Sequence, residues 1–177
     1  MTALADRVEK GSVTFRVPLG VAEHGDLIRP EVAVKGEPFA CPGCGDPLTF
    51  RAGEVRARHF AHRATGICTS ETVLHATAKR LVAESVDLWR AGRRETPVTV
   101  RRCATCNRSF NRPIPESVTH AVVERQLASG RVVDVALLGA DDIVVGAVEV
   151  FVAHAVDESK AVDLGSLPWV EVAAERS

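Results

Sequence analysis

The sequence lacks several features that would assign a protein to a membrane or to bulk nucleic acid. No run approaches the ~18 consecutive apolar residues of a membrane span, so no membrane partner is expected. The first residues, "MTALADRVEKG", carry early charge and no apolar signal core, which predicts a cytoplasmic protein. The net charge is only −1, so any attraction to nucleic acid must come from local patches. Internal repeats and low-complexity segments are also missing.

What the sequence does contain is typical of a globular protein. Of its 177 residues, 46% are hydrophobic and 25% are charged, a balance that supports one sizeable core, or one domain with a small appendage. Charge is distributed unevenly, because arginines gather between residues 90 and 112 and acidic residues gather toward the C-terminus. This asymmetry marks the arginine-rich span as a local basic patch.

The five cysteines form two CxxC pairs, Cys41 with Cys44 and Cys103 with Cys106, and one single residue, Cys68. In a cytoplasmic protein such pairs indicate metal binding rather than disulfides. A CxxC turn containing Gly or Pro lets two thiolates bind one tetrahedral zinc ion. Cys68 is expected to be merely buried.

Two partners compete for the first CxxC pair. The second CxxC pair would complete a closed four-cysteine site, whereas His59 and His62 would complete a finger-like site. The two-residue gap between these histidines is shorter than the three to five residues usual in fingers. The finger-like pairing would also leave the second CxxC pair without ligands. We therefore favour a structural Zn²⁺ held by four cysteines.

The chain is expected to be β-rich at first and mixed afterwards. Residues 12–62 read as short strands and turns, with a first knuckle at the CxxC pair. A helix is predicted from Ser70, as its N-cap, to a stop at Gly92, followed by a linker over 91–97. The remainder predicts strands, a short helix over 157–165 and a last strand. The prediction is an α/β (α+β) fold with a mixed sheet, divided into segments 1–66 and 67–177.

Five motifs in series resemble one family. They are "FACPGCGDPL", "GEVRARHFAH", "SETVLHATAK", "RVVDVAL" and "VEVFVAHAVDESK", covering about residues 38–165. Together they are similar to the competence protein CoiA-like family, among the nucleases of the restriction-endonuclease-like PD-(D/E)xK superfamily. The resemblance implies a restriction-endonuclease-like core with zinc-ribbon-like knuckles, and a Mg²⁺- or Mn²⁺-dependent nuclease that acts on DNA.

The acids expected to hold the catalytic metal are Asp134 and Glu149. Phosphodiester hydrolysis needs carboxylates gathered at the end of a sheet, where they hold Mg²⁺ against a phosphate oxygen. Antiparallel neighbours joined by "LLGADDI" could bring the two side chains together. Both lie in apolar runs, where a carboxylate is costly unless it binds something. The alternative is that each is a strand-end acid exposed to water.

On the predicted helix, Glu71, His75 and Lys79 share one face because they are four residues apart. Without the resemblance, a solvated stripe is the simpler interpretation. With it, Glu71 becomes a third metal ligand or a water-holder, and His75 a candidate acid or base. Lys79 would then stabilise the charge that develops on the phosphate.

One position departs from the superfamily pattern. Two residues after the second acid, where Lys is usual and Gln is common in CoiA-like proteins, this chain has Phe151. Either Lys79 or Lys160 supplies the missing cation, or activity has been lost. The rival hypothesis is therefore a catalytically inactive nucleic-acid-binding or adaptor module. In both cases Arg56, Arg58, His59 and His62 are expected at the DNA-binding face.

Overall fold

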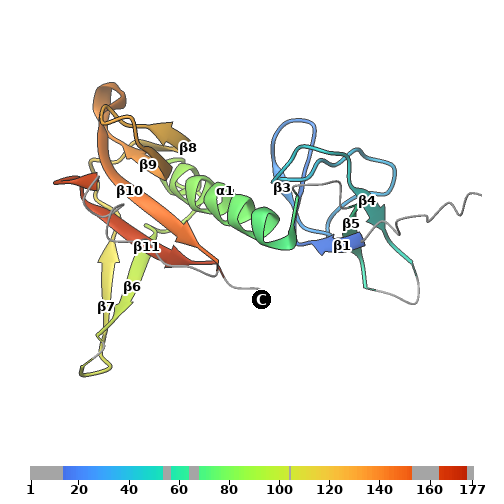
Figure 1. The fold of residues 1–177 in the computed structure, drawn as a ribbon, viewed down its shortest axis with the longest axis horizontal. Helices are drawn as coiled ribbons and strands as arrows, with labels where there is room; N and C mark the ends of the chain where they lie inside the picture. Colours follow the sequence, from blue (N-terminus) through green and yellow to red (C-terminus); the bar gives the residue numbers. More distant parts are fainter. Residues whose placement is uncertain (1–13, 54–56, 64–67, 104, 153–163, 175–177) are drawn as a thin grey trace, which may run out of the picture. The chain divides into compact units, whose positions relative to one another are not determined.

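A computed structural model describes residues 14–53, 57–63, 68–103, 105–152 and 164–174. The chain forms two compact units, residues 1–73 and 74–177, and the division between them lies inside a helix. The first unit is built mainly from short strands. The second combines a helix with a larger sheet (Figure 1). Among the described residues, no helix is both long and apolar enough to cross a membrane.

The first unit is a small β structure around aromatic side chains. Its three-stranded antiparallel sheet has the order β1-β5-β4, with β1 at Thr14–Val17, β5 at His59–Arg63 and β4 at Thr49–Arg51. A second, two-stranded piece pairs β2 (Gly20–Val21) with β3 (Leu27–Ile28). Strands this short bury little surface individually, so the unit depends on its core and its loops.

Phe60 is the centre of the first core. It is fully buried, and its ring centroid lies 4.9 Å from that of Phe39 and 5.3 Å from that of Phe50. Gly20 approaches this ring so closely that a Cβ there would lie 3.0 Å from Phe60 Cζ. The strand that contains "HFAH" therefore has its phenylalanine, rather than its first histidine, at the core.

The long helix begins and ends as its sequence signals require. Helix α1 spans Ser70–Arg90, but its N-cap is Thr69 and not Ser70, because Thr69 Oγ1 accepts the N–H of Thr72 at 3.1 Å. At the other end Gly92 has φ of 68°, and the N–H groups of Gly92 and Arg93 bond to the carbonyls of Trp89 and Leu88. This is a Schellman ending, in which Gly is favoured.

The second unit contains a four-stranded mixed sheet with the order β11-β10-β9-β8. The strands are β8 (His120–Gln126), β9 (Val132–Leu138), β10 (Val144–Phe151) and β11 (Trp169–Ala173). β10 runs antiparallel to β9 and parallel to β11, which confirms the predicted mixed sheet and the central position of the apolar run. A 3₁₀ turn, η1 (Ala140–Asp142), joins β9 to β10.

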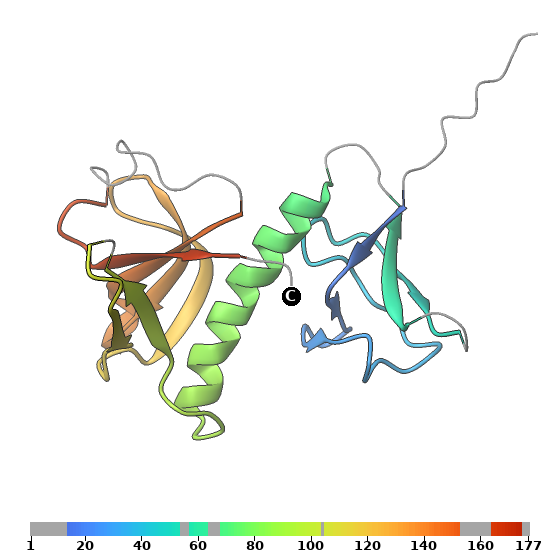
Figure 2. The same ribbon diagram turned by 90° about the horizontal axis from the view of Figure 1, so that it is seen from below.

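Both faces of this sheet are covered. On one face, Ala83 and Val86 of α1 pack against Val135 and Val148, and Figure 2 shows the helix lying along that face. On the other, a separate cluster contains residues of β9 and β10 together with Leu164. The short helix predicted over 157–165 falls mainly in 153–163, outside the described residues.

A two-stranded hairpin projects from the second unit. It pairs β6 (Val98–Arg102) with β7 (Ser109–Pro113), and the second CxxC pair lies in its turn (Figure 1). Every residue of β7 is exposed. The predicted linker over 91–97 leads directly into this hairpin.

Candidate functional site

Four potential metal ligands meet in the first unit. They are Cys41, Cys44, His62 and Cys68, and their ligand atoms all lie within 4.8 Å of one another. Cys41 Sγ is 3.9 Å from Cys68 Sγ, and Cys44 Sγ is 3.1 Å from His62 Nε2. The cluster could hold a metal such as zinc.

Local folding explains how these four side chains come together. The N–H of Cys41 bonds to the carbonyl of Asp46 at 2.8 Å, and the N–H of Gly45 bonds back to the carbonyl of Cys41 at 2.9 Å. These bonds close a knuckle that turns both sulfurs to one side. His62 comes from β5, where its ring packs 5.2 Å from that of Phe15. Cys68 lies just before the first turn of α1.

The geometry fits a tetrahedral zinc ion. Bonds of about 2.3 Å to sulfur and about 2.0 Å to nitrogen place neighbouring ligand atoms roughly 3.5 to 3.8 Å apart. The two separations of 3.9 Å and 3.1 Å lie close to that range. Three thiolates and one imidazole are a set that structural zinc sites use.

The structure offers a different ligand set from the one expected from the sequence. We expected Cys103 and Cys106 to complete the first knuckle, and we expected His62 to contact DNA and Cys68 to be merely buried. Instead the first unit completes its own site, since β5 directs His62 inward, where it is only 1% exposed. His59, three residues earlier on the strand, is not in the cluster.

Burial controls the charge of the cluster's thiols. Burial, followed by the neighbouring sulfurs of Cys44 and Cys41, raises the pKa of Cys68 to about 12. Burial likewise raises the pKa of Cys44. Without a cation Cys44 and Cys68 thus favour the neutral thiol, whereas a bound metal requires thiolates.

The second CxxC pair forms the same kind of knuckle by itself. The N–H of Cys103 bonds to the carbonyl of Arg108, and the N–H of Asn107 bonds to the carbonyl of Cys103, each at 2.9 Å. Backbone N–H groups of Cys106 and Thr105 lower the pKa of Cys103. Among the described residues, no His or acid joins this pair to form a group of three ligands.

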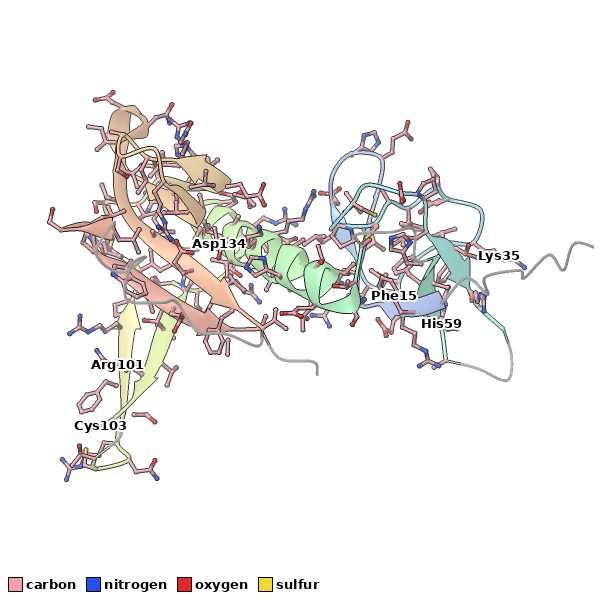
Figure 3. All side chains as sticks on the ribbon, in the orientation of Figure 1. Phe15, Lys35, His59, Arg101, Cys103 and Asp134 are labelled. Carbon is pink, nitrogen blue, oxygen red and sulfur yellow. The ribbon has the colours of Figure 1, made fainter. Side chains whose placement is uncertain are left out.

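A second cluster of polar side chains lies where α1 meets β9 (Figure 3). His75 Nε2 is 3.2 Å from Asp134 Oδ2 and 2.9 Å from the carbonyl oxygen of Val150. Asp134 Oδ2 also accepts the N–H of Val150 at 2.9 Å. Lys79 Nζ lies 3.8 Å from Asp134 Oδ1. The helix face predicted from the sequence therefore brings His75 and Lys79 to Asp134.

One member of this cluster, Glu124, could not be identified from the sequence. Lys79 is only 7% exposed, and its ammonium donates to Glu124 Oε1. Glu124 adopts a left-handed conformation, with φ of 57°, between the ladder pairs Val123–Val135 and Arg125–Val133. Non-glycine residues rarely adopt this conformation. A lone glutamate in an otherwise ordinary strand carries no sequence signal for it.

Glu149 lies on β10, the strand next to the one that carries Asp134. It is fully buried, and its partner in the parallel ladder is Glu171 of β11, a second acid that the sequence did not single out. The β9–β10 ladder ends at Val135–Val148, just before Asp134 and Glu149.

The remaining predicted residues are placed as follows. Glu71 is exposed in the first turn of α1, within the first unit. Arg58 donates to the carbonyls of Glu31 at 2.6 Å and Ala33 at 2.7 Å, and its guanidinium lies 5.2 Å from the Phe50 ring. These contacts tie it to the loop before the knuckle. Arg56 and Lys160 lie outside the described residues.

Comparison with known proteins gives one result. Residues 29–71 match the family model of the competence protein CoiA, N-terminal domain. This part of the first unit is similar to a CoiA N-terminal domain. The matched span contains all four cluster ligands, so the candidate metal site lies within the region of similarity. The match to this family model supports the CoiA-like family and suggests a competence-related role. The match does not extend to Asp134 or Glu149, and no curated protein and no solved structure matches the chain.

Proposed function

We propose that the second unit is a restriction-endonuclease-like core and that the protein is a metal-dependent DNA nuclease. The observation that carries this proposal is the convergence of His75 and Lys79, one helical turn apart, on Asp134. An unspecialised solvated stripe would not bury its lysine against a strand carboxylate. The CoiA N-terminal domain adds support, because a competence-related role involves DNA.

The donor set suits a hard cation such as Mg²⁺ or Mn²⁺, which prefers carboxylate oxygens. Asp134 and Glu149 would hold such an ion, which supplies Lewis-acid activation of a phosphate oxygen or of water. Asp134 Oδ2 accepts the two hydrogen bonds at the end of β9, so its carboxylate orientation is fixed in advance. This arrangement leaves Oδ1 on the side of Lys79.

The other residues of the cluster have roles that follow from their positions. His75, one-third exposed, faces two acceptors at Nε2, the Val150 carbonyl oxygen and Asp134 Oδ2, so this nitrogen carries a proton and would serve as a donor. Lys79 supplies a buried positive charge, which replaces the cation that Phe151 lacks. Glu124 holds the lysine in place. Glu71 belongs to the first unit, and its predicted role as a third ligand stays a prediction.

We also propose that Cys41, Cys44, His62 and Cys68 hold a structural zinc. Such a site is closed by four protein ligands and leaves no position for substrate. Zinc would therefore stabilise the CoiA N-terminal domain, and catalysis would reside in the second unit.

The nuclease proposal is tested by incubating the protein with single- and double-stranded DNA in Mn²⁺, and in EDTA as the metal-free control. We expect cleavage that Asp134→Asn and Glu149→Gln each reduce by at least about 100-fold, as is common when a catalytic electrostatic group is removed. Asp87→Asn, which neutralises an exposed carboxylate on the same helix, is the matched control and should cut normally. Unchanged cutting by both site variants would refute the assignment.

A specific observation favours a second candidate function, a non-catalytic DNA-binding adaptor. Phe151 cannot orient water or stabilise charge at the position where the superfamily has lysine. The adaptor predicts no cutting by the unaltered protein with any metal, together with DNA binding that weakens as salt is added.

A further inference from the structure

The hairpin β6–β7 carries a dense and unbalanced positive charge. Residues 96–115 contain four arginines and no aspartate or glutamate, whereas the whole chain has a net charge of −1. Within the part of the chain that the structure describes, no carboxylate pairs with Arg101, Arg108 or Arg112. This hairpin, residues 98–113, is here called the basic arm.

The register of the basic arm sorts its side chains by face. Arg101 pairs directly with Phe110, and Thr99 pairs with Arg112. Directly opposed residues in an antiparallel ladder share a face, and alternate pairs face the same way. Arg101, Phe110 and Arg112 therefore lie on one face, while Val98 and Val100 lie on the other. The basic arm thus has a cationic face with one aromatic ring in it.

The basic arm is also unusually exposed for its composition. Phe110 is 54% exposed and Val100 is 64% exposed, and no other strand of the described chain pairs with β6 or β7. An isolated two-stranded ribbon is marginally stable in water. Figure 3 shows Arg101 along the basic arm and Cys103 near its tip, both away from the four-stranded sheet of the same unit. A surface of this kind is built to meet a partner.

We propose that the basic arm binds the sugar-phosphate backbone of duplex DNA across a major groove. This inference rests on the proposed function as a DNA-acting protein and assigns the surface that holds the substrate. A two-stranded β-ribbon fits the major groove, which is about 12 Å wide. Arginines on its cationic face would contact phosphates and give affinity without reading sequence, and Phe110 would make apolar contact with base edges.

The tip knuckle gives the basic arm a defined end. Its two backbone hydrogen bonds at Cys103 fix the turn, with Asn107 in a left-handed conformation at φ of 57°. Arg108 follows directly after this turn. The knuckle therefore places Arg108 at a constant distance from the arginines on the two strands.

The test is a binding titration with the full-length chain, using a fluorescent 20-base-pair duplex at several salt concentrations in EDTA, so that no cleavage occurs. The variant is Arg101→Gln, Arg108→Gln and Arg112→Gln combined. The matched control removes the same charge from exposed arginines outside the basic arm: Arg29→Gln, Arg93→Gln and Arg125→Gln. Thermal unfolding of both variants checks that the fold is retained.

We expect the arm variant to reduce the slope of log K against log salt by about 2.7, since each lost phosphate contact removes about 0.9. The control should change the slope by less than one contact. Equal effects in the two variants would overturn the proposal, and so would an absence of duplex binding. Preference for a single strand of the same sequence would overturn the groove geometry, and preference for acidic peptides would identify a protein partner instead.

This outcome is separable from that of the nuclease assay. If duplex binding depends on the arm arginines but no DNA is cleaved, the nuclease proposal is refuted. The basic arm is then still supported as a DNA-binding surface. If the arm substitutions change neither cleavage nor duplex binding, the nuclease proposal stands and the inference about the basic arm is refuted.

Discussion

The zinc site allows a sharp prediction, because its ligands are scattered along the sequence and each can be replaced alone. We expect His62→Ala and Cys68→Ser each to abolish zinc binding. Removing one of four ligands leaves an incomplete tetrahedron, and a zinc ion held by only three protein ligands is held far less tightly. The purified protein should otherwise contain about one zinc per chain.

The size of the effect follows from the small core of the first unit. Its strands are two to five residues long, and its buried cluster is centred on a few aromatic rings. Structural zinc contributes on the order of 10 kcal/mol of folding free energy, comparable to the whole stability of an ordinary domain. Loss of zinc should therefore unfold the first unit rather than loosen it.

Elemental analysis and limited proteolysis together measure this outcome. His59→Ala is the matched control for His62→Ala, because it removes an imidazole from the same strand outside the cluster. Cys103→Ser with Cys106→Ser is the control for Cys68→Ser. Zinc retained in His62→Ala and Cys68→Ser, but lost in the Cys103/Cys106 variant, would refute the assignment and restore the four-cysteine pairing.

Three further predictions concern local structure. Thr69→Ala should lower the free energy of unfolding by about 1 kcal/mol through loss of the N-cap bond, and Ser70→Ala should cost clearly less in the same denaturant titration. Gly20→Ala should destabilise by roughly 1 to 3 kcal/mol, because its new methyl group would press on Phe60, whereas Gly53→Ala, with open space around it, should not. Cys103 should be alkylated at a lower pH than Cys106, since backbone N–H groups stabilise its thiolate and depress its pKa; equal labelling profiles by mass spectrometry would contradict this.

The second unit could be predicted well because its signals are local and periodic. The sequence shows clear signals for a 21-residue helix that ends at a glycine. It shows equally clear signals for long apolar strands separated by turns. The resemblance then identified the helix face of His75 and Lys79, and the structure places both against Asp134. Glu124 was missed because its role depends on a backbone conformation, left-handed at φ of 57°, that nothing in "VVERQ" signals.

The ligand set expected from spacing differs from the cluster in the structure for a physical reason. Spacing rules treat a second CxxC pair as the natural partner of the first, but partners are chosen by the fold. His62 of β5 and Cys68, just before α1, both lie close to the sulfurs of the first knuckle. The signal that could have found them is their shared segment: "HFAH" and the lone cysteine both lie within the short stretch between the first knuckle and the helix.

Separating the two knuckles changes what each can be for. The first lies in a cluster of four candidate ligands, together with His62 and Cys68, in which only Cys44 is exposed. The second has an exposed Cys106, two sulfurs and a turn fixed by backbone bonds at the end of a cationic hairpin. A single shared ion would have made the hairpin part of one rigid structural site. If the first cluster holds its own ion, the hairpin does not have to supply ligands to it. The arginines of the hairpin can then contact a partner.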